Sequence, residues 1–145
     1  MTTLNTSTYR PLTAMGLSAG VVAVAASLVN ALVAVVAVGL GATAAGGLLP
    51  QAYITFTVVA AIAGAAGWHL INRYARRPER IITWLVPTFL VVSFIPDVAV
   101  GLDLGWLTAG ALMVMHVTTI AIAVIAYRRF MPLRDGDSAK GDAVS

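Results

Sequence analysis

Long apolar runs dominate this chain, and one short basic stretch divides them into two halves. Residues 73–80 read Arg-Tyr-Ala-Arg-Arg-Pro-Glu-Arg, which places four arginines within eight residues. An arginine near the centre of a bilayer is costly, so four of them do not fit inside one spanning helix. We therefore predict that this stretch is a loop outside the membrane, between two pairs of membrane spans.

The apolar runs on either side are long enough for two spans each. A helix rises about 1.5 Å per residue, so about 20 apolar residues cross a hydrocarbon core of about 30 Å. We predict an all-α membrane protein, a four-helix transmembrane bundle, with spans at about 12–40, 53–72, 81–100 and 104–127. Residues 12–127 would form one domain, between a short N-terminus at 1–11 and a disordered tail at 128–145.

Two connectors are expected at the ends of the spans away from the arginines. Residues 41–52 are glycine-rich and uncharged, which indicates a flexible connector. Pro96 is expected to end the third span, so that residues 96–106 form a loop. A cleaved signal peptide is an alternative for the start of the chain, but the first apolar run exceeds the roughly 7–15 residues of a signal core.

Composition and charge support this layout and suggest an orientation. The chain is 59% hydrophobic and only 10% charged, whereas soluble domains carry roughly 25% charged residues. All nine basic residues fall on one side of the four-span layout, which predicts that both termini are cytoplasmic. The predicted location is the bacterial cytoplasmic (inner) membrane. Nucleic-acid binding is not indicated, because the basic residues flank apolar spans.

Small residues repeat along three of the spans. In the first span they recur at alternating steps of four and three: Gly16, Gly20, Ala23, Ser27, Asn30, Ala34, Ala37 and Gly41. The second and fourth spans carry similar stripes: Thr57, Ala60, Gly64 and Gly67, and Ala109, Met113, His116, Thr119 and Ala123. Small side chains let membrane helices approach closely. We therefore predict that these three stripes face the interior of the bundle.

His116 is the clearest candidate for chemistry within the membrane. It precedes Arg128 by 12 residues, which places it about 18 Å along the helix from the basic end, near the bilayer midplane. An ionisable side chain there indicates a proton relay, an ion site or a ligand contact. The alternative is a neutral imidazole bonded to another helix, since no carboxylate is expected at this depth. With Asn30, Ser27 and Thr119 it forms a candidate intramembrane polar site. Asn30 is expected to join helices there, and a substrate contact is the alternative.

Asp97 and Asp103 form a candidate acidic loop on the outer side. One interpretation is an access site for a cation or proton; the other is a turn in which Asp103 caps the fourth helix. Ser93, Asp97 and His116 have the residue types of a hydrolase triad. However, Asp97 is expected at the surface and His116 at the midplane, so no triad is predicted. No metal site and no cofactor are predicted from the sequence.

The second half of the chain carries a recognisable combination of motifs. These are the arginine-rich loop, Ser93-Phe-Ile-Pro-Asp97, Gly105-Trp106 and Leu112-Met-Val-Met-His116. Together they resemble an uncharacterised actinobacterial four-pass membrane family, a domain of unknown function, with the best likeness over about residues 67–132. The resemblance implies four membrane helices and a high-GC bacterial source. It implies no reaction, substrate or cofactor, so no functional residues are carried over.

Two functions are predicted. The first is non-enzymatic: helix–helix association in the lipid bilayer, with a second copy or with a membrane-protein partner. The second is a small oligomeric transporter or proton-coupled carrier that uses His116. Four-pass exporters of similar size carry a glutamate in the first helix, where this chain has Asn30 and Ser27. An intramembrane enzyme is disfavoured, because no catalytic constellation is assembled.

Overall fold

A computed structural model describes residues 9–134, with side chains from residue 12 onward. The described helices are α1 (Tyr9–Gly39), the short 3-10 helix η1 (Gly46–Leu48), α2 (Pro50–Tyr74), α3 (Pro78–Leu104) and α4 (Trp106–Phe130). Each of the four α-helices is long and apolar enough to cross a membrane. The predicted all-α class with four spans is confirmed. Of the predicted terminal segments, residues 1–8 and 135–145 lie outside the described residues.

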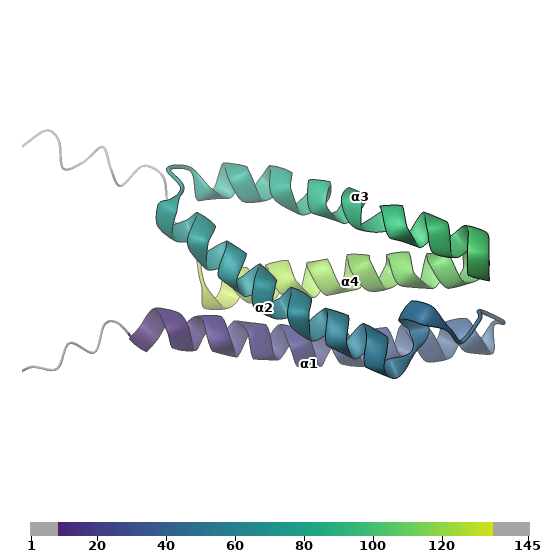
Figure 1. The fold of residues 1–145 in the computed structure, drawn as a ribbon. Coiled ribbons are helices and arrows are strands. Elements are labelled where there is room, and N and C mark those ends of the chain that lie inside the picture. The colour runs from purple at the N-terminus through teal and green to yellow at the C-terminus, as the bar shows by residue number, and fades with distance from the viewer. Residues whose placement is uncertain (1–8, 135–145) are drawn as a thin grey trace, which may run out of the picture.

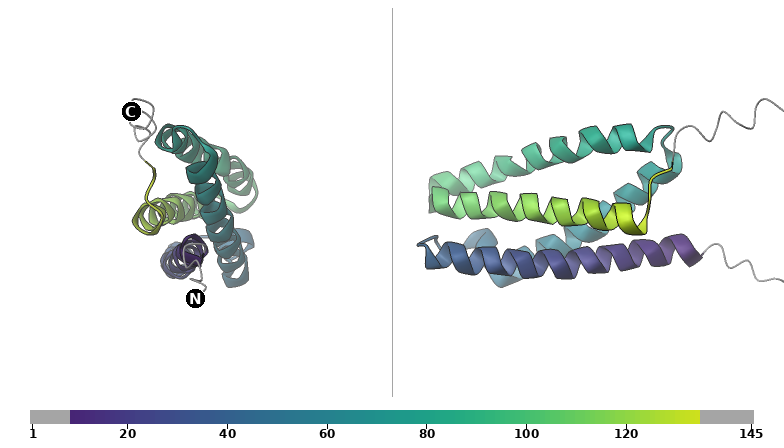
Figure 2. Two further views of the ribbon diagram at one scale, coloured as in Figure 1. Left: turned by 90° about the vertical axis from the view of Figure 1, so that its left-hand side faces the viewer. Right: turned by 180° about the vertical axis from the view of Figure 1, so that it is seen from behind.

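Three helices form a row, and α2 crosses it. α4 lies between α1 and α3 and packs against both, while α3 has no extensive contact with α1 (Figures 1 and 2). α2 begins against α1 and runs obliquely to the start of α3, which it meets only near the loop that joins them. α4 is therefore the central helix of the bundle.

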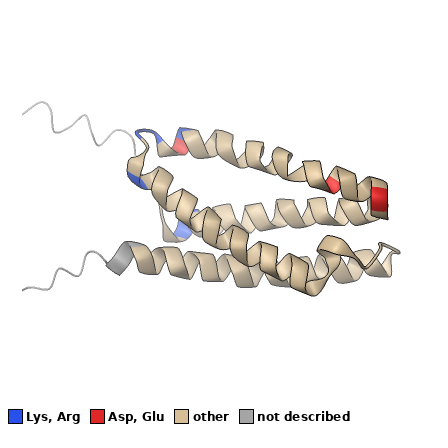
Figure 3. Ribbon diagram, in the orientation of Figure 1, with Lys and Arg blue, Asp and Glu red and all other residues tan. Residues whose placement is uncertain are grey.

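The described arginines gather at one end of the bundle, which we call the arginine end (Figure 3). α2 ends there, α3 begins there and α4 ends there, and these termini carry Arg73, Arg76, Arg77, Arg80, Arg128, Arg129 and Arg134. Asp97 and Asp103 lie in the part of α3 towards the opposite end. The long axis of the bundle is thus strongly polarised in charge.

α3 is longer than predicted, and the loop expected at residues 96–106 does not form. The helix continues through Pro87 and Pro96 to Leu104 and stops at Gly105, whose φ is +96°. A proline removes one backbone hydrogen bond, but unwinding the chain at membrane depth would leave several polar groups unpaired. The corner is tight because Gly101 has no side chain: a Cβ there would lie 2.8 Å from Cε3 of Trp106.

The connector between α1 and α2 is docked onto the bundle instead of hanging free. Thr43 lies in this connector, outside the helices. Its backbone N–H donates to Oγ1 of Thr108 at 3.1 Å, and its hydroxyl donates to the carbonyl of Leu104 at 3.1 Å. Leu48 of η1 is buried, and a Cβ on Gly47 would lie 2.7 Å from Cδ2 of Leu112. These contacts fix the connector against the α3–α4 corner.

Two apolar clusters make up the core. The cluster nearer the arginine end contains Val22, Ala61, Ala65, Trp68, Ile82, Ala126, Tyr127 and Met131. The cluster nearer the opposite end contains Ala34, Ala37, Ala42, Leu48, Ala111, Leu112 and Met115. The first cluster is assembled largely from α1, α2 and α4, and the second from α1, α4 and the connector that contains η1. The segments of α1, α2 and α4 between the clusters carry polar residues.

The buried line on α1 differs from the predicted stripe in the half nearer the arginine end. It follows Ser18, Val22, Ala26, Asn30, Ala34 and Ala37. Gly16 and Gly20 are exposed, and beyond the adjacent backbone no described atom lies within 4 Å of a Cβ built on either. Steps of four follow the ridge along which helices pack when they cross at an angle, and α2 crosses α1 obliquely. The predicted stripe, with a mean spacing of 3.5 residues, was wrong in this half because that spacing applies to a neighbouring helix that lies nearly parallel.

We predict that Gly64→Ala destabilises the bundle by about 1–3 kcal/mol, because it overpacks a buried contact. A Cβ on Gly64 would lie 2.8 Å from the hydroxyl of Tyr127, whose ring is buried and whose O–H donates to the carbonyl of Ala61 at 2.7 Å. Gly67→Ala is the matched control, since nothing lies within 4 Å of its added methyl. Thermal unfolding of the two variants in detergent, monitored by circular dichroism, tests this prediction. Equal melting temperatures would contradict it.

Candidate functional site

The structure brings Asp97 of α3 and His116 of α4 together. Nδ1 of His116 lies 3.0 Å from Oδ2 of Asp97 and 3.0 Å from the carbonyl oxygen of Leu112 in the preceding turn. A carbonyl and a carboxylate oxygen are both acceptors, so Nδ1 is the ring nitrogen that carries hydrogen here. In this tautomer of the neutral ring, the second nitrogen, Nε2, carries a lone pair and no hydrogen.

Helix geometry explains why these two side chains meet. Asp97 lies eight residues before Gly105 and His116 lies eleven residues after it, so His116 is deeper from the corner by about 4.5 Å. The Cα–Cβ bonds of a helix tilt towards its N-terminus. Because α3 and α4 are antiparallel, Asp97 leans towards the arginine end and His116 leans away from it. The opposite tilts close the offset.

The two partners differ in exposure. The side chain of Asp97 is 5% exposed, whereas that of His116 is 38% exposed, so the helices enclose the carboxyl group and the imidazole borders the surface of the bundle. Oδ2 of Asp97 has no hydrogen-bond partner of good geometry among the described residues, and its close neighbour is the imidazole. The ring of Phe94 meets the imidazole edge-on, with 6.4 Å between ring centroids. A carboxyl group buried at this depth is costly and therefore depends on its partner.

The pair corrects the prediction that no carboxylate lies near His116. Asp97 sits inside α3 and is buried, instead of lying in an outer loop. Asp103 is exposed in the last turn of α3 and does not cap α4, whose N-cap is Gly105 without a side-chain hydrogen bond. Gly105 is the sequence signal that would have found the pair. Taking it as the corner of a helical hairpin places Asp97 and His116 on facing segments.

Asn30 forms a second polar contact, on the other side of α4. Its Nδ2 donates to Oγ1 of Thr57 in α2 at 3.0 Å and to Oγ1 of Thr119 in α4 at 3.1 Å. Thr118 lies 3.5 Å from the Asn30 carbonyl oxygen but bonds more closely to carbonyls of its own helix. Asn30, which is buried, thus joins α1, α2 and α4 between the two apolar clusters.

The predicted polar site therefore separates into two parts. Asn30 and Thr119 are hydrogen-bonded to each other, while His116 pairs with Asp97 of α3 and forms no hydrogen bond with either. The hydroxyl oxygen of Ser27 is buried and has no hydrogen-bond partner among the described residues. Ser93 donates to the carbonyl of Leu90 at 2.7 Å, so it does not complete a triad with the Asp97–His116 pair.

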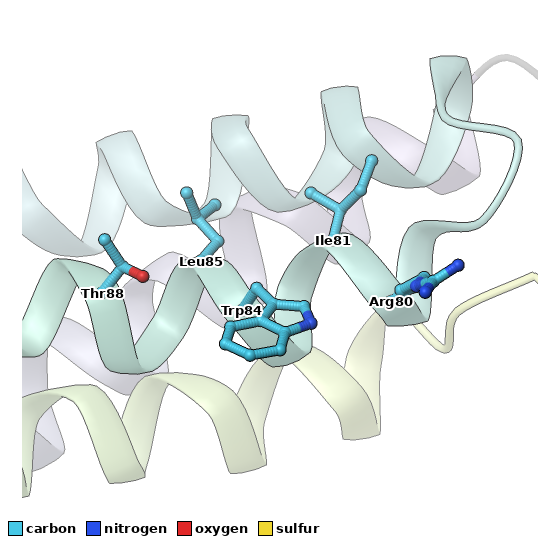
Figure 4. Close-up of a pocket in the computed structure, with 5 residues that line it drawn as sticks. All are labelled: Arg80, Ile81, Trp84, Leu85 and Thr88. Atoms are coloured by element: carbon cyan, nitrogen blue, oxygen red, sulfur yellow. The ribbon is translucent and has the colours of Figure 1, made fainter.

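Two hollows in the surface lie away from this pair. The first has a volume of about 480 Å³ and is shown in Figure 4. It is lined by Arg80, Ile81, Trp84, Leu85 and Thr88, which all belong to α3. An apolar hollow formed by one exposed helix face is a lipid-facing surface in a membrane. The second lies at the arginine end and has a volume of about 410 Å³.

Within residues 9–134, no cluster of three or more His, Asp or Glu residues is suited to a metal ion.

These features define a multi-pass membrane protein of four helices with an acid–histidine pair between two of them. Residues 7–132 match a family described as a family of unknown function, DUF6069, and the chain belongs to this family. The match extends well beyond the second half of the chain, where the motifs lie. No curated protein and no solved structure matches the chain.

We predict that Asn30→Ala destabilises the bundle by about 1–2 kcal/mol, because it removes the donor shared by Thr57 and Thr119. Ser27→Ala, one turn earlier on α1, is the control and should cause no loss, because its hydroxyl makes no hydrogen bond to the described residues. Unfolding free energies in mixed micelles provide the comparison. A double-mutant cycle with Thr119→Ala should give a coupling energy of roughly 0.6 kcal/mol or more; strict additivity would exclude the contact.

Proposed function

We propose that this protein is a small transporter that carries protons across the membrane and that the Asp97–His116 pair exchanges them. The contact of 3.0 Å between a buried carboxyl group and a partly exposed imidazole is the observation that carries this proposal. Ionisable side chains inside a membrane are rare, and they typically mark proton or ion pathways. The pair supplies the carboxylate whose expected absence had argued against a proton role for His116.

The charge of the pair depends on one proton. With Asp97 ionised and His116 neutral, the pair carries one negative charge. Adding a proton at Nε2 gives an ion pair of zero net charge, and moving the Nδ1 proton to Asp97 would give two neutral groups. In an apolar environment the state with a net negative charge costs more free energy than either of the two states with no net charge. The deprotonated pair should therefore attract water or a cation, and the protonated pair should favour close packing of α3 on α4.

The proposed orientation places the arginine end in the cytoplasm of a bacterial inner membrane. All seven arginines whose side chains the structure describes lie at this end, and Asp103 lies near the other. Basic residues are retained on the cytoplasmic side of membrane proteins. In this orientation the Asp97–His116 pair lies in the outer half of the membrane, about 10 Å along α3 from its end at Leu104.

Proton flux into liposomes tests this proposal. Full-length protein reconstituted with a trapped pH-sensitive dye should acidify the lumen when a potassium diffusion potential, negative inside, is imposed. Asp97→Asn and His116→Gln should each reduce the rate at least about tenfold, as expected when one member of a proton-transfer pair is removed. Asp103→Asn is the matched control, because Asp103 is an exposed carboxylate on the same helix.

The outcome is informative in both directions. Flux in the wild type and in Asp103→Asn, with loss in the two pair variants, would support the proposal. Flux no higher than in protein-free liposomes, or equal flux in Asp97→Asn and wild type, would contradict it. Melting temperatures of the variants show whether a lost flux reflects unfolding.

A second candidate function is self-association through α1. Gly16 and Gly20 are one turn apart on the exposed face of this helix, and beyond the adjacent backbone no described atom lies within 4 Å of a Cβ built on either. Glycines at this spacing permit close contact between membrane helices. They were predicted to face the bundle interior, so their exposure leaves them available to another helix. A transporter of only four helices would gain a path between copies by such association.

We predict that Gly16→Leu combined with Gly20→Leu converts an oligomer in nanodiscs to a monomer, because the larger side chains block close approach. Gly39→Leu is the control, since Gly39 is an exposed glycine at the end of the same helix with open space around it. Native mass spectrometry of nanodisc-embedded protein gives the stoichiometry. A wild type that is monomeric at every protein-to-lipid ratio would rule out this function.

A further inference from the structure

The pocket at the arginine end has a polar rim and an apolar wall. His69, Asn72 and Arg73 of α2 and Arg134, which follows α4, form the polar part. The apolar part includes Ala14 of α1 and Phe130 of α4. Its volume is about 410 Å³. The pocket is therefore amphipathic and lies where three membrane helices reach their ends.

A network of hydrogen bonds positions this rim. The indole of Trp68 donates to the carbonyl of Met131 at 2.9 Å, and Nδ2 of Asn72 donates to the carbonyl of Pro132 at 2.9 Å. The backbone N–H of Arg134 donates to Oδ1 of Asn72 at 3.0 Å. The Asn72 amide thus uses both of its ends to hold the segment after α4 against the last turn of α2.

This network brings two arginines into one pocket. Nη1 of Arg134 lies 3.4 Å from the carbonyl oxygen of Arg73, a contact between residues 61 positions apart in the chain. A guanidinium group has five N–H donors, so this single long contact leaves most of them for a ligand. Within residues 9–134, no carboxylate lies within ion-pair distance of Arg73 or Arg134. The rim is therefore cationic, and its donors suit a phosphate group.

We propose that this pocket binds the phosphate group of an anionic phospholipid. Arg73 and Arg134 would contact the phosphate, and the glycerol and upper acyl chain would lie against Ala14 and Phe130. A free phosphate ion shares the same anionic chemistry, but it would leave the apolar wall in water. Basic pockets between membrane helices at the end of a bundle are suited to anionic headgroups. This site is independent of the Asp97–His116 pair, so it neither requires nor tests proton transport.

Native mass spectrometry of the full-length protein in a neutral detergent tests the site. Phosphatidylglycerol is the anionic probe, phosphatidylcholine is the neutral headgroup control, and inorganic phosphate is the small-ion competitor. The wild type should retain phosphatidylglycerol in preference to phosphatidylcholine, and millimolar phosphate should not displace it. Each basic residue near an anionic headgroup contributes roughly fivefold in affinity, so Arg73→Gln with Arg134→Gln should weaken retention roughly 30-fold.

Matched variants separate the pocket from general surface charge. Arg128→Gln with Arg129→Gln removes the same charge at the same end, but neither residue lines the pocket, so retention should change less than about threefold. Arg73→Lys with Arg134→Lys keeps the charge and should retain at least partial binding. Equal losses in the two Gln pairs, no preference over phosphatidylcholine, or displacement by inorganic phosphate would each overturn the proposal. Unchanged melting temperatures establish that the variants are folded.

Discussion

A polar group at membrane depth needs a partner inside the protein, and this constraint accounts for the arrangement of α3 and α4. Leaving the helix at Pro96 would expose several backbone groups to lipid, so α3 continues to Leu104 and turns at Gly105. The extension carries Asp97 into the buried part of the bundle. A carboxyl group there requires a partner, and the opposing tilts of Asp97 and His116 bring the imidazole to it.

The same constraint operates on the other side of α4. The Asn30 amide cannot be solvated by lipid, and it is satisfied by hydroxyl groups from two other helices. These hydrogen bonds lie between two clusters built mainly of alanine and other apolar residues, which pack closely but specify little about register. A directional hydrogen bond at one depth in the bundle specifies the register between helices, which packing of small apolar side chains does not. Asn30 thus sets the positions of α1, α2 and α4 along their axes.

The sequence was sufficient for the fold class but only partly for the site. Four spans followed from run length and from the arginines at residues 73–80, because the cost of a charge in lipid leaves little choice. The sequence did not predict which side of each helix is buried. Gly16 and Gly20 belong to the small-residue stripe but are exposed. A stripe of small residues does not indicate whether the neighbouring helix crosses obliquely or lies parallel. The site was missed because Pro96 was taken as a helix end, although Gly105 is the actual corner.

The two polar contacts divide α4 into a side held by neutral groups and a side that carries an ionisable pair. Asn30, Thr57 and Thr119 are neutral at every physiological pH, so the attachment of α4 to α1 and α2 does not vary with protonation. The attachment of α4 to α3 includes a pair whose net charge changes by one with a single proton. In the most apolar 18-residue part of each helix, only 11% of the residues of α3 are buried, compared with 28% for α4. α3 packs almost entirely against α4, so few contacts with other helices hold it in place. A change of charge at Asp97 and His116 would therefore act mainly on the packing of α3 against the other three helices.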